Sequence, residues 1–297
     1  MSALGGRASR GWLLAAAAGL MTVACGSAAG LPQPVATPPA HTRPAAPPPT
    51  LSATPAASSR AATSPASTGG SGSASKPLAG KIVGIDPGHN GDNGADPGYI
   101  NQIIWNGRES ETCDTTGTQT ATGYTEAKFN FNVARYLRAD LRAEGARVVM
   151  TRTNNHGVGP CVNRRARIID DAHANVAIDI HADGGPTWGR GFTVLEPVAD
   201  GPNDRVIRSS QRFGNDVRAA MLQHTSMPES NYYGTDGLIT RNDLAGLNLT
   251  TVPKVLIECG NMPNSIDAGL LASPAFQQQL ARAFEAAIMV FLTGKSG

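Results

Sequence analysis

The chain has 297 residues, and its 25 Lys and Arg residues against 23 Asp and Glu residues give a net charge of +2. This near-neutral balance, with basic residues interspersed among acidic ones, argues against a nucleic-acid-binding protein. About 215 residues that follow the N-terminal segments are enough for one α/β domain with a sizeable core. We therefore expect a monomer with a single folded unit that binds no nucleic acid.

The first thirty residues have the features of an export signal. Arg7 and Arg10 precede an apolar run, residues 12–24, that is too short to span a membrane comfortably, and small residues follow it. The segment Thr22-Val23-Ala24-Cys25 loosely resembles the lipobox of bacterial lipoproteins, in which the cysteine is acylated. Lipidation of Cys25 and simple removal of the signal peptide both stay open. Either outcome places the protein in the periplasm or cell envelope, with a lipid anchor as its one expected membrane attachment.

Residues 31–77 consist mainly of Pro, Ala, Ser and Thr. Such a segment cannot bury enough apolar surface to offset its ordering entropy. Its proline content favours an extended conformation. We expect a disordered tether ahead of the folded domain, which we assign to residues 78–294.

Strand and helix signals alternate along this domain. Short apolar runs predict strands at residues 81–85, 146–151, 176–180, 192–195 and 254–257. Helical periodicity predicts helices at residues 125–143, 162–173, 205–222 and 274–291, the last with Ser273 as N-cap and Pro274 in the first turn. The alternation predicts an α/β fold, with an open, mixed and mostly parallel sheet covered by helices.

Four residues of the types found in catalytic zinc sites lie at element ends. His89 follows the first strand, His181 ends the third, and Glu258 ends the last; open α/β sheets bind ligands at the carboxyl ends of their strands. Glu126 lies in the first turn of the first helix, on its buried face. Two imidazoles and a carboxylate can hold Zn²⁺ with one position open for water, and a further carboxylate can move a proton.

Each of these four residues also has a plainer interpretation. Glu126 would favour the positive end of its helix, and Glu258 would fit a buried ion pair. A lone histidine more often satisfies a hydrogen bond than binds a metal. Their joint occurrence favours the metal site.

Segments along the whole domain resemble one known family. They are Ile85-Asp86-Pro87-Gly88-His89, Glu126, Thr151-Arg152, Arg165, Asp179-Ile180-His181-Ala182-Asp183, the run from Pro253 to Gly260, and Asn264. In this order they resemble the zinc-dependent N-acetylmuramoyl-L-alanine amidases of the type 3 family, which hydrolyse the amide bond between N-acetylmuramic acid and L-alanine in peptidoglycan. The resemblance implies one Zn²⁺ held by His89, Glu126 and His181, with Glu258 as general acid and base.

Two other functions stay open: another zinc peptidoglycan hydrolase, such as a peptidase or deacetylase, and a cell-wall-binding protein without catalysis. A binding protein needs no proton carrier at the position of Glu258. The wide separation of His89 from Glu126 argues against carboxypeptidases with a His-x-x-Glu motif.

The chain departs from the family pattern at three points. Asn90 replaces a second glycine after His89, Asp179 replaces a serine, and Cys259-Gly260-Asn261 replaces Gly-Phe after Glu258. Asp179 lies two residues before His181, on the same strand face, where a carboxylate can orient an imidazole. The alternative is an ion pair of Asp179 with Arg152 or Arg165. Cys259 should point away from Glu258.

The long polar stretch between His89 and Glu126 contains Trp105 and Cys113. Long loops in compact domains are usually functional or mobile, so we expect this stretch to border the substrate groove, with Trp105 in contact with glycan or peptide. The alternative is a mobile insertion.

Cys113 and Cys161 both lie in polar, turn-like segments of an exported chain, which predicts a disulfide between them; two free thiols are the alternative. Among the other histidines, His156 is the reserve candidate for a metal ligand.

Overall fold

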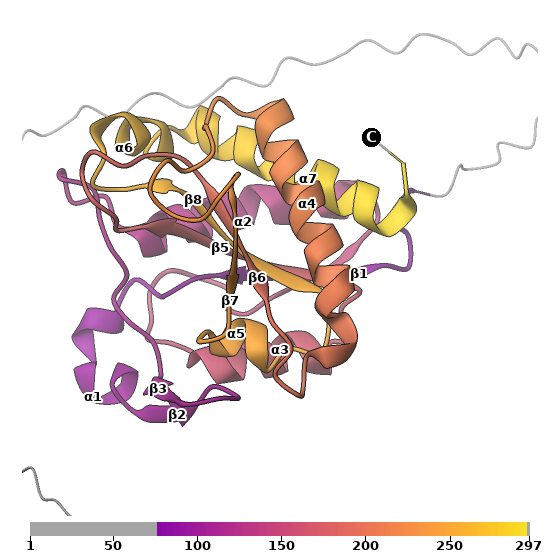
Figure 1. The fold of residues 1–297 in the computed structure, drawn as a ribbon, viewed down its shortest axis with the longest axis horizontal. Helices are drawn as coiled ribbons and strands as arrows, with labels where there is room; N and C mark the ends of the chain where they lie inside the picture. The colour runs from indigo at the N-terminus through magenta and orange to yellow at the C-terminus, as the bar shows by residue number, and fades with distance from the viewer. Residues whose placement is uncertain (1–75, 296–297) are drawn as a thin grey trace, which may run out of the picture. The chain divides into compact units, whose positions relative to one another are not determined.

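A six-stranded sheet forms the centre of the part of the protein that the computed structural model describes, residues 76–295 (Figure 1). The strand order is β4-β1-β5-β8-β6-β7. All neighbouring pairs are parallel except β6 and β8, which are antiparallel. The strands are β1 (Ile82–Pro87), β4 (Arg147–Met150), β5 (Val176–Asp183), β6 (Thr193–Pro197), β7 (Leu238–Arg241) and β8 (Lys254–Asn261). The predicted mixed, mostly parallel α/β fold is confirmed.

Helices cover both faces of this sheet. Figure 1 shows α2, α4 and α7 on one face and α3 and α5 on the other. The first face holds the larger core, in which Ile178 and Ile257 of the sheet pack with Phe129 and Phe284 of the helices. The helices are α1 (Pro97–Ile100), α2 (Glu126–Ala143), α3 (Val162–Asp171), α4 (Ile207–His224), α5 (Ala245–Asn248), α6 (Ser265–Leu271) and α7 (Pro274–Thr293), with 3₁₀ turns at Asn93–Ala95 and Asp204–Val206.

Strand register places four polar side chains next to one another. Asp86 of β1 is the Cα partner of Asp179 in β5, and His181 of β5 is the partner of Glu258 in β8. Because side chains alternate between the two faces of a strand, these four residues point away from the large core. The parallel strands β1, β5 and β8 therefore bring four polar side chains to one edge and one face of the sheet.

The five predicted strands and four predicted helices are all present, with some different ends. β5 and β8 continue to Asp183 and Asn261, so His181 and Glu258 lie inside their strands rather than at the last residue. Ser273 and Pro274 occupy the predicted positions at the start of α7, although the Ser273 side chain makes no capping hydrogen bond within residues 76–295. The edge strand β7 and the short helices α5 and α6 were not predicted.

The stretch between His89 and Glu126 is ordered by short elements, including a hairpin of β2 (Ile103–Trp105) and β3 (Ser110–Thr112). It is a structured insertion. The predicted signal segment with Cys25, and the predicted tether as far as residue 75, lie outside the described residues. Within residues 76–295, no helix is both long enough and apolar enough to cross a membrane.

One carboxylate outside the polar group is buried between the sheet and α4. Glu196 of β6 lies against α4 at Gly214, where an added Cβ would overlap Glu196 Oε1. That oxygen has no hydrogen-bond partner among the described residues. Burial raises the pKa of Glu196 from 4.5 to about 7. The folded protein therefore binds this proton more tightly than the unfolded chain does.

The raised pKa predicts that ionisation of Glu196 lowers the free energy of unfolding of the protein. The loss develops as the pH rises from about 4.5 to about 7. The Glu196→Gln variant should have a higher Tm than the wild type at pH 8, and nearly the same Tm at pH 4. Calorimetry at both pH values measures the difference. Glu109→Gln, at an exposed turn position, serves as control, and an equal Tm difference at the two pH values would contradict the prediction.

Candidate active site

Three of the predicted site residues form a compact group. One ligand atom from each of His89, Glu126 and His181 lies within 4.8 Å of the others. The Glu126 carboxylate is in the middle, with Oε2 3.3 Å from His89 Nε2 and Oε1 2.8 Å from His181 Nδ1. The side chains come from the turn after β1, the first turn of α2, and β5. Their donor types and spacing suit a divalent cation.

Backbone conformation allows this close approach. His89 has a φ of 57°, in the left-handed region that few residues other than glycine adopt. A Cβ at Gly88 would overlap the His181 ring, and a Cβ at Gly117 would lie 2.7 Å from both Glu126 Oε2 and His89 Cδ2. Gly88 and Gly117 are therefore required where the backbone touches the site.

A second carboxylate contacts the outer nitrogen of each imidazole. His89 Nδ1 lies 2.9 Å from Asp114 Oδ1, and His181 Nε2 lies 3.3 Å from Asp179 Oδ1. Carboxylates in this position fix the orientation of metal-binding histidines and increase their basicity. Asp179 has the contact with His181 that its strand position suggested, whereas no sequence pattern pointed to Asp114.

Asp114 and Asp179 belong to a buried charge cluster, which also contains Asp86, Arg165 and Lys254. Lys254 Nζ lies 2.9 Å from Asp86 Oδ2 and 3.3 Å from Asp179 Oδ2. Arg165 lies 3.0 Å from Asp86 Oδ1 and 3.2 Å from Asp114 Oδ2. Both chains of contacts start at Asp86, and each ends at one of the two histidines.

The ion pairs in this cluster offset the cost of burial. Burial alone would lower the pKa of Lys254, but the carboxylates of Asp179 and Asp86 raise it above its ordinary value. Burial alone would raise the pKa of Asp86, but Lys254 and Arg165 hold it below its ordinary value. Lys254 and Asp86 are therefore both charged at neutral pH, although each side chain is only 1% exposed.

The carboxylates also favour positive charge on the imidazoles. Burial alone would lower the pKa of His89, but Glu126 and Asp114 raise it to about 9. The pKa of His181 is raised well above 6.5, because Asp179 and Glu126 outweigh its burial. With both imidazoles neutral, as metal binding requires, the four carboxylates in these contacts exceed the cations of Lys254 and Arg165 by two negative charges. A divalent cation matches this excess, so the donor set and the charge of the site both fit Zn²⁺.

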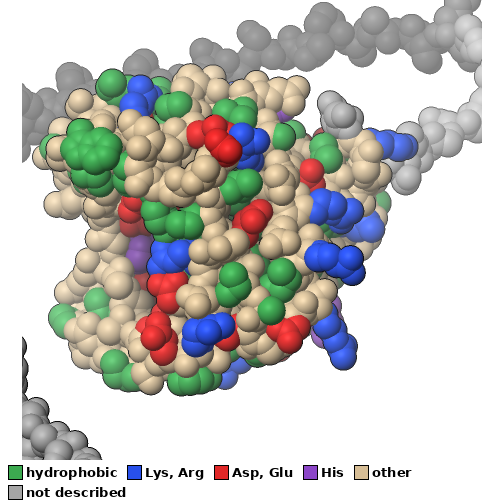
Figure 2. All heavy atoms as spheres, in the orientation of Figure 1, with side chains coloured by type: hydrophobic (Ala, Val, Ile, Leu, Met, Phe, Trp, Pro, Cys, Tyr) green, Lys and Arg blue, Asp and Glu red, His purple; other side chains and the backbone are tan. Residues whose placement is uncertain are grey.

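Glu258 faces the same cleft, which has a volume of about 260 Å³ and is lined by all three candidate metal ligands. Its Oε2 is buried and has no hydrogen-bond partner within residues 76–295. Burial raises the pKa of Glu258 from 4.5 to about 8; His181 opposes the increase, and Glu126 adds to it. In Figure 2, a histidine is visible beside acidic and basic side chains in a recess on the left of the molecule. The cleft therefore combines a candidate cation site with a separate buried carboxylate, Glu258.

Residues 83–289 match the sequence profile of the N-acetylmuramoyl-L-alanine amidases. The chain belongs to this family. It is 38% identical to the N-acetylmuramoyl-L-alanine amidase Rv3717 of Mycobacterium tuberculosis, over 72% of this chain and 88% of that protein. Its fold is similar to the crystal structure of the amidase Ami1 of Mycobacterium smegmatis, with a TM-score of 0.69 and 39% identity over 73% of this chain and 99% of that one. Ami1 of Mycobacterium abscessus gives a TM-score of 0.68 and 38% identity, over 72% and 100% of the two chains.

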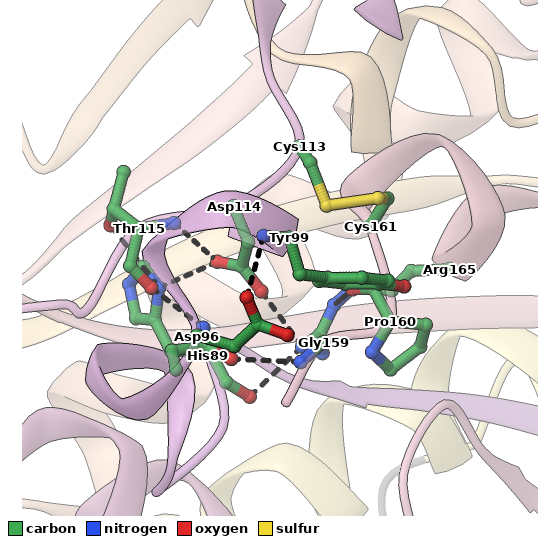
Figure 3. Close-up of a disulfide and its surroundings, with 11 residues drawn as sticks. His89, Asp96, Tyr99, Cys113, Asp114, Thr115, Gly159, Pro160, Cys161 and Arg165 are labelled. Carbon is green, nitrogen blue, oxygen red and sulfur yellow. Dashed lines mark hydrogen bonds and ion pairs between the residues drawn. A yellow bond between two sulfur atoms is a disulfide. The ribbon is translucent and has the colours of Figure 1, made fainter. Parts of the chain in front are cut away.

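A disulfide joins Cys113 to Cys161 in this amidase, as predicted, so the alternative of two free thiols is wrong (Figure 3). Cys113 directly precedes Asp114, which contacts His89. Cys161 is the N-cap residue of α3, the helix that carries Arg165. The bridge therefore joins the two segments that supply the Asp114–Arg165 pair.

Other residues singled out in the sequence support the backbone around the site. Arg152 donates hydrogen bonds to the carbonyl oxygens of Pro87, Gly88 and Ala127. Asn90 donates to the carbonyl of Gly159. The suggested pairing of Asp179 with Arg152 or Arg165 is wrong, because its cationic partner among the described residues is Lys254.

The remaining candidates lie outside the His-Glu-His group. Cys259 packs in the large core and points away from Glu258, as expected. His156 is exposed. Trp105 is 58% exposed on β2 and does not line the cleft formed by the described residues. Glu111 and Thr112 of the same hairpin line a cavity of about 190 Å³ that also contacts His89 and His181, so the insertion does border the site.

Removal of the disulfide should weaken the fold of the amidase. The bridge spans 48 residues, and closing a loop of this length in the unfolded chain is worth about 4 kcal/mol. The Cys113→Ala/Cys161→Ala variant should lose about this free energy of unfolding in urea titrations without reductant. Reductant should lower the stability of the wild type but not of the variant, and equal stability of the two proteins without reductant would contradict the prediction.

Substitutions of Asp179 and Lys254 should have non-additive effects on the free energy of unfolding. Lys254→Met leaves two buried carboxylates without their shared cation and should cost about 3–5 kcal/mol, as for other broken buried pairs. Adding Asp179→Ser removes one of those carboxylates and leaves Asp86 paired with Arg165. The double variant should therefore be more stable than the sum of the two single changes by at least about 1 kcal/mol.

Urea unfolding of all four proteins in the presence of chelator measures this coupling without any contribution from bound metal. Strict additivity of the two single changes would show that the residues act independently.

Proposed function

We propose that this amidase hydrolyses the amide bond between N-acetylmuramic acid and L-alanine in peptidoglycan, with one Zn²⁺ held by His89, Glu126 and His181. Glu258 acts as the proton carrier. The observation that carries the proposal is the position of Glu258, a buried carboxylate with an unpaired oxygen among the described residues, in the cleft that the His-Glu-His group lines.

An amide has a weakly electrophilic carbonyl and a poor leaving group. Bound Zn²⁺ supplies Lewis acidity and lowers the pKa of water. Asp114 and Asp179 hold the two imidazoles in position. Glu258 accepts a proton from the attacking water and delivers it to the departing L-alanine nitrogen, so that one carboxylate serves as base and then as acid.

The other two functions have less support. The match to the amidase family covers nearly the whole of the described domain, which favours the amidase over a peptidase or deacetylase. A raised pKa at Glu258 suits proton transfer near neutral pH and has no purpose in a protein that only binds cell wall.

The proposed substrate implies action at the cell envelope. We retain the division into a signal segment at residues 1–30, a tether at residues 31–77 and the catalytic domain at residues 78–294. Both fates of Cys25, lipidation and removal with the signal peptide, place the amidase next to peptidoglycan. Trp105, exposed on the hairpin that borders the site, remains a candidate for contact with glycan or peptide.

The Glu258→Gln variant should still bind zinc but should release stem peptide from peptidoglycan at least about 100-fold more slowly, because proton transfer to the leaving nitrogen is lost. Mass spectrometry of the products identifies the bond cleaved, since an amidase releases free stem peptide with L-alanine at its amino terminus. Metal analysis of the variant checks that the site is loaded.

Treatment of the wild type with chelator should also abolish release, and zinc should restore it. Glu285→Gln, on α7 and outside the cleft, is the control and should keep full activity. Unchanged release by the chelated protein would refute the metal site, and shortened stems that stay attached to sugar would identify a peptidase.

A further inference from the structure

The loop between β5 and β6 presents an exposed tryptophan beside the active-site cleft. Trp188 is 68% exposed. Its loop, residues 184–191, begins directly after Asp183, and both Asp183 and Gly184 line the cleft together with Glu258. Large exposed apolar groups near a cleft often mark a binding surface.

This loop is held in one conformation by side chains that follow Glu258 in the chain. Asn261 accepts a hydrogen bond from Gly185 N and donates to the carbonyl oxygens of Pro186 and Gly189. Asn264 donates to the carbonyl oxygen of Thr187, immediately before Trp188. Trp188 is therefore exposed on a fixed backbone, which avoids the entropy cost of ordering a mobile loop on binding.

Tyr232 connects Trp188 to the cleft. Its ring packs against Gly185 and Gly189, where an added Cβ would overlap it. Burial and the Asp183 carboxylate raise the pKa of Tyr232, so its hydroxyl stays protonated and donates to Asp183 Oδ2 at 2.7 Å. Trp188 and Tyr232 meet edge to face, with ring centroids 6.4 Å apart. A continuous surface thus runs from the cleft past Asp183 and Tyr232 to the indole.

The loop that carries Trp188 has little free charge. Arg190 is the one charged residue in the loop, and its Nε lies 3.2 Å from the fully buried Asp267. Asp267 also accepts a hydrogen bond from Gly191 N. Asp267 of α6 therefore neutralises the one cation of the loop, and the loop offers an aromatic face rather than a charged contact. Such a face suits an uncharged pyranose ring, whose C–H groups can stack on an indole, better than a stem peptide with free carboxylates.

We propose that Trp188, supported by Tyr232, is a stacking platform for a sugar ring of the glycan strand next to the bond that is cleaved. This proposal rests on the proposed amidase function, because it takes peptidoglycan as the substrate. It assigns the glycan to the Trp188 side of the cleft.

Binding of sugar alone can be measured without turnover. The chain has three tryptophans, and the indole N–H signal of Trp188 in an NMR spectrum is identified by its loss in Trp188→Phe. Chitotetraose, an uncharged oligomer of N-acetylglucosamine, should shift this signal, whereas free stem tripeptide should not. No shift with chitotetraose, or an equal shift with the tripeptide, would overturn the proposal.

Retention on insoluble peptidoglycan tests the same platform with the polymer, in the Glu258→Gln background so that no bond is cut. Trp188→Ala should weaken retention about fivefold, as expected for the loss of one aromatic contact, and Trp188→Tyr should retain most of it. Leu222→Ala, an exposed position on α4, is the control. Retention by Trp188→Ala equal to that of its parent would also overturn the proposal.

The two proposals fail in different ways. Absence of free stem peptide among the wild-type products would refute the amidase reaction, whatever chitotetraose does to Trp188. Normal stem-peptide release together with an unshifted Trp188 signal would refute the sugar platform alone.

Discussion

One buried carboxylate, Asp86, fixes the positions of both imidazoles in the candidate metal site. Its two oxygens pair with Lys254 and Arg165, and each cation reaches a second carboxylate that touches one histidine. An unpaired charge is very costly in such a buried position. None of these side chains can therefore move alone, and charge balance keeps the two histidines facing the same point.

The fold supplies this arrangement through the order of its strands. β1, β5 and β8 are adjacent and parallel, so polar residues from three distant parts of the chain share one face. α2 contributes Glu126 from its first turn, where the positive end of the helix favours a carboxylate. α5 covers the Asp179–Lys254 pair through Gly246, where a Cβ would lie 3.3 Å from both charged groups. The larger core lies on the opposite face of the sheet, so most of the hydrophobic packing is remote from the polar site.

Periodicity was enough to predict the long elements, because it is a local signal, and the candidate ligands followed from their residue types, their places at element ends and the resemblance to the amidase family. The partners of those ligands were not predictable in this way. Lys254 and Asp86 are 168 residues apart, and a lysine within an apolar strand run carries no local sign of its partner. Asp114 lies in an irregular insertion without periodicity. β7 and α5 have only four residues each, too few for a periodic pattern, and tertiary contacts determine them.

Glu258 lies on β8, which is paired on one side with β5 at His181 and on the other with β6 at Thr193. Its backbone is therefore held from both sides and cannot follow the reacting atoms. In the proposed reaction, the Glu258 carboxylate would first face a water molecule and then a departing nitrogen, and it could do so only by rotation about its own side-chain bonds. The reach of these rotations limits where the scissile bond can lie. The length of the glutamate side chain therefore sets the distance from β8 at which a substrate bond could be cleaved.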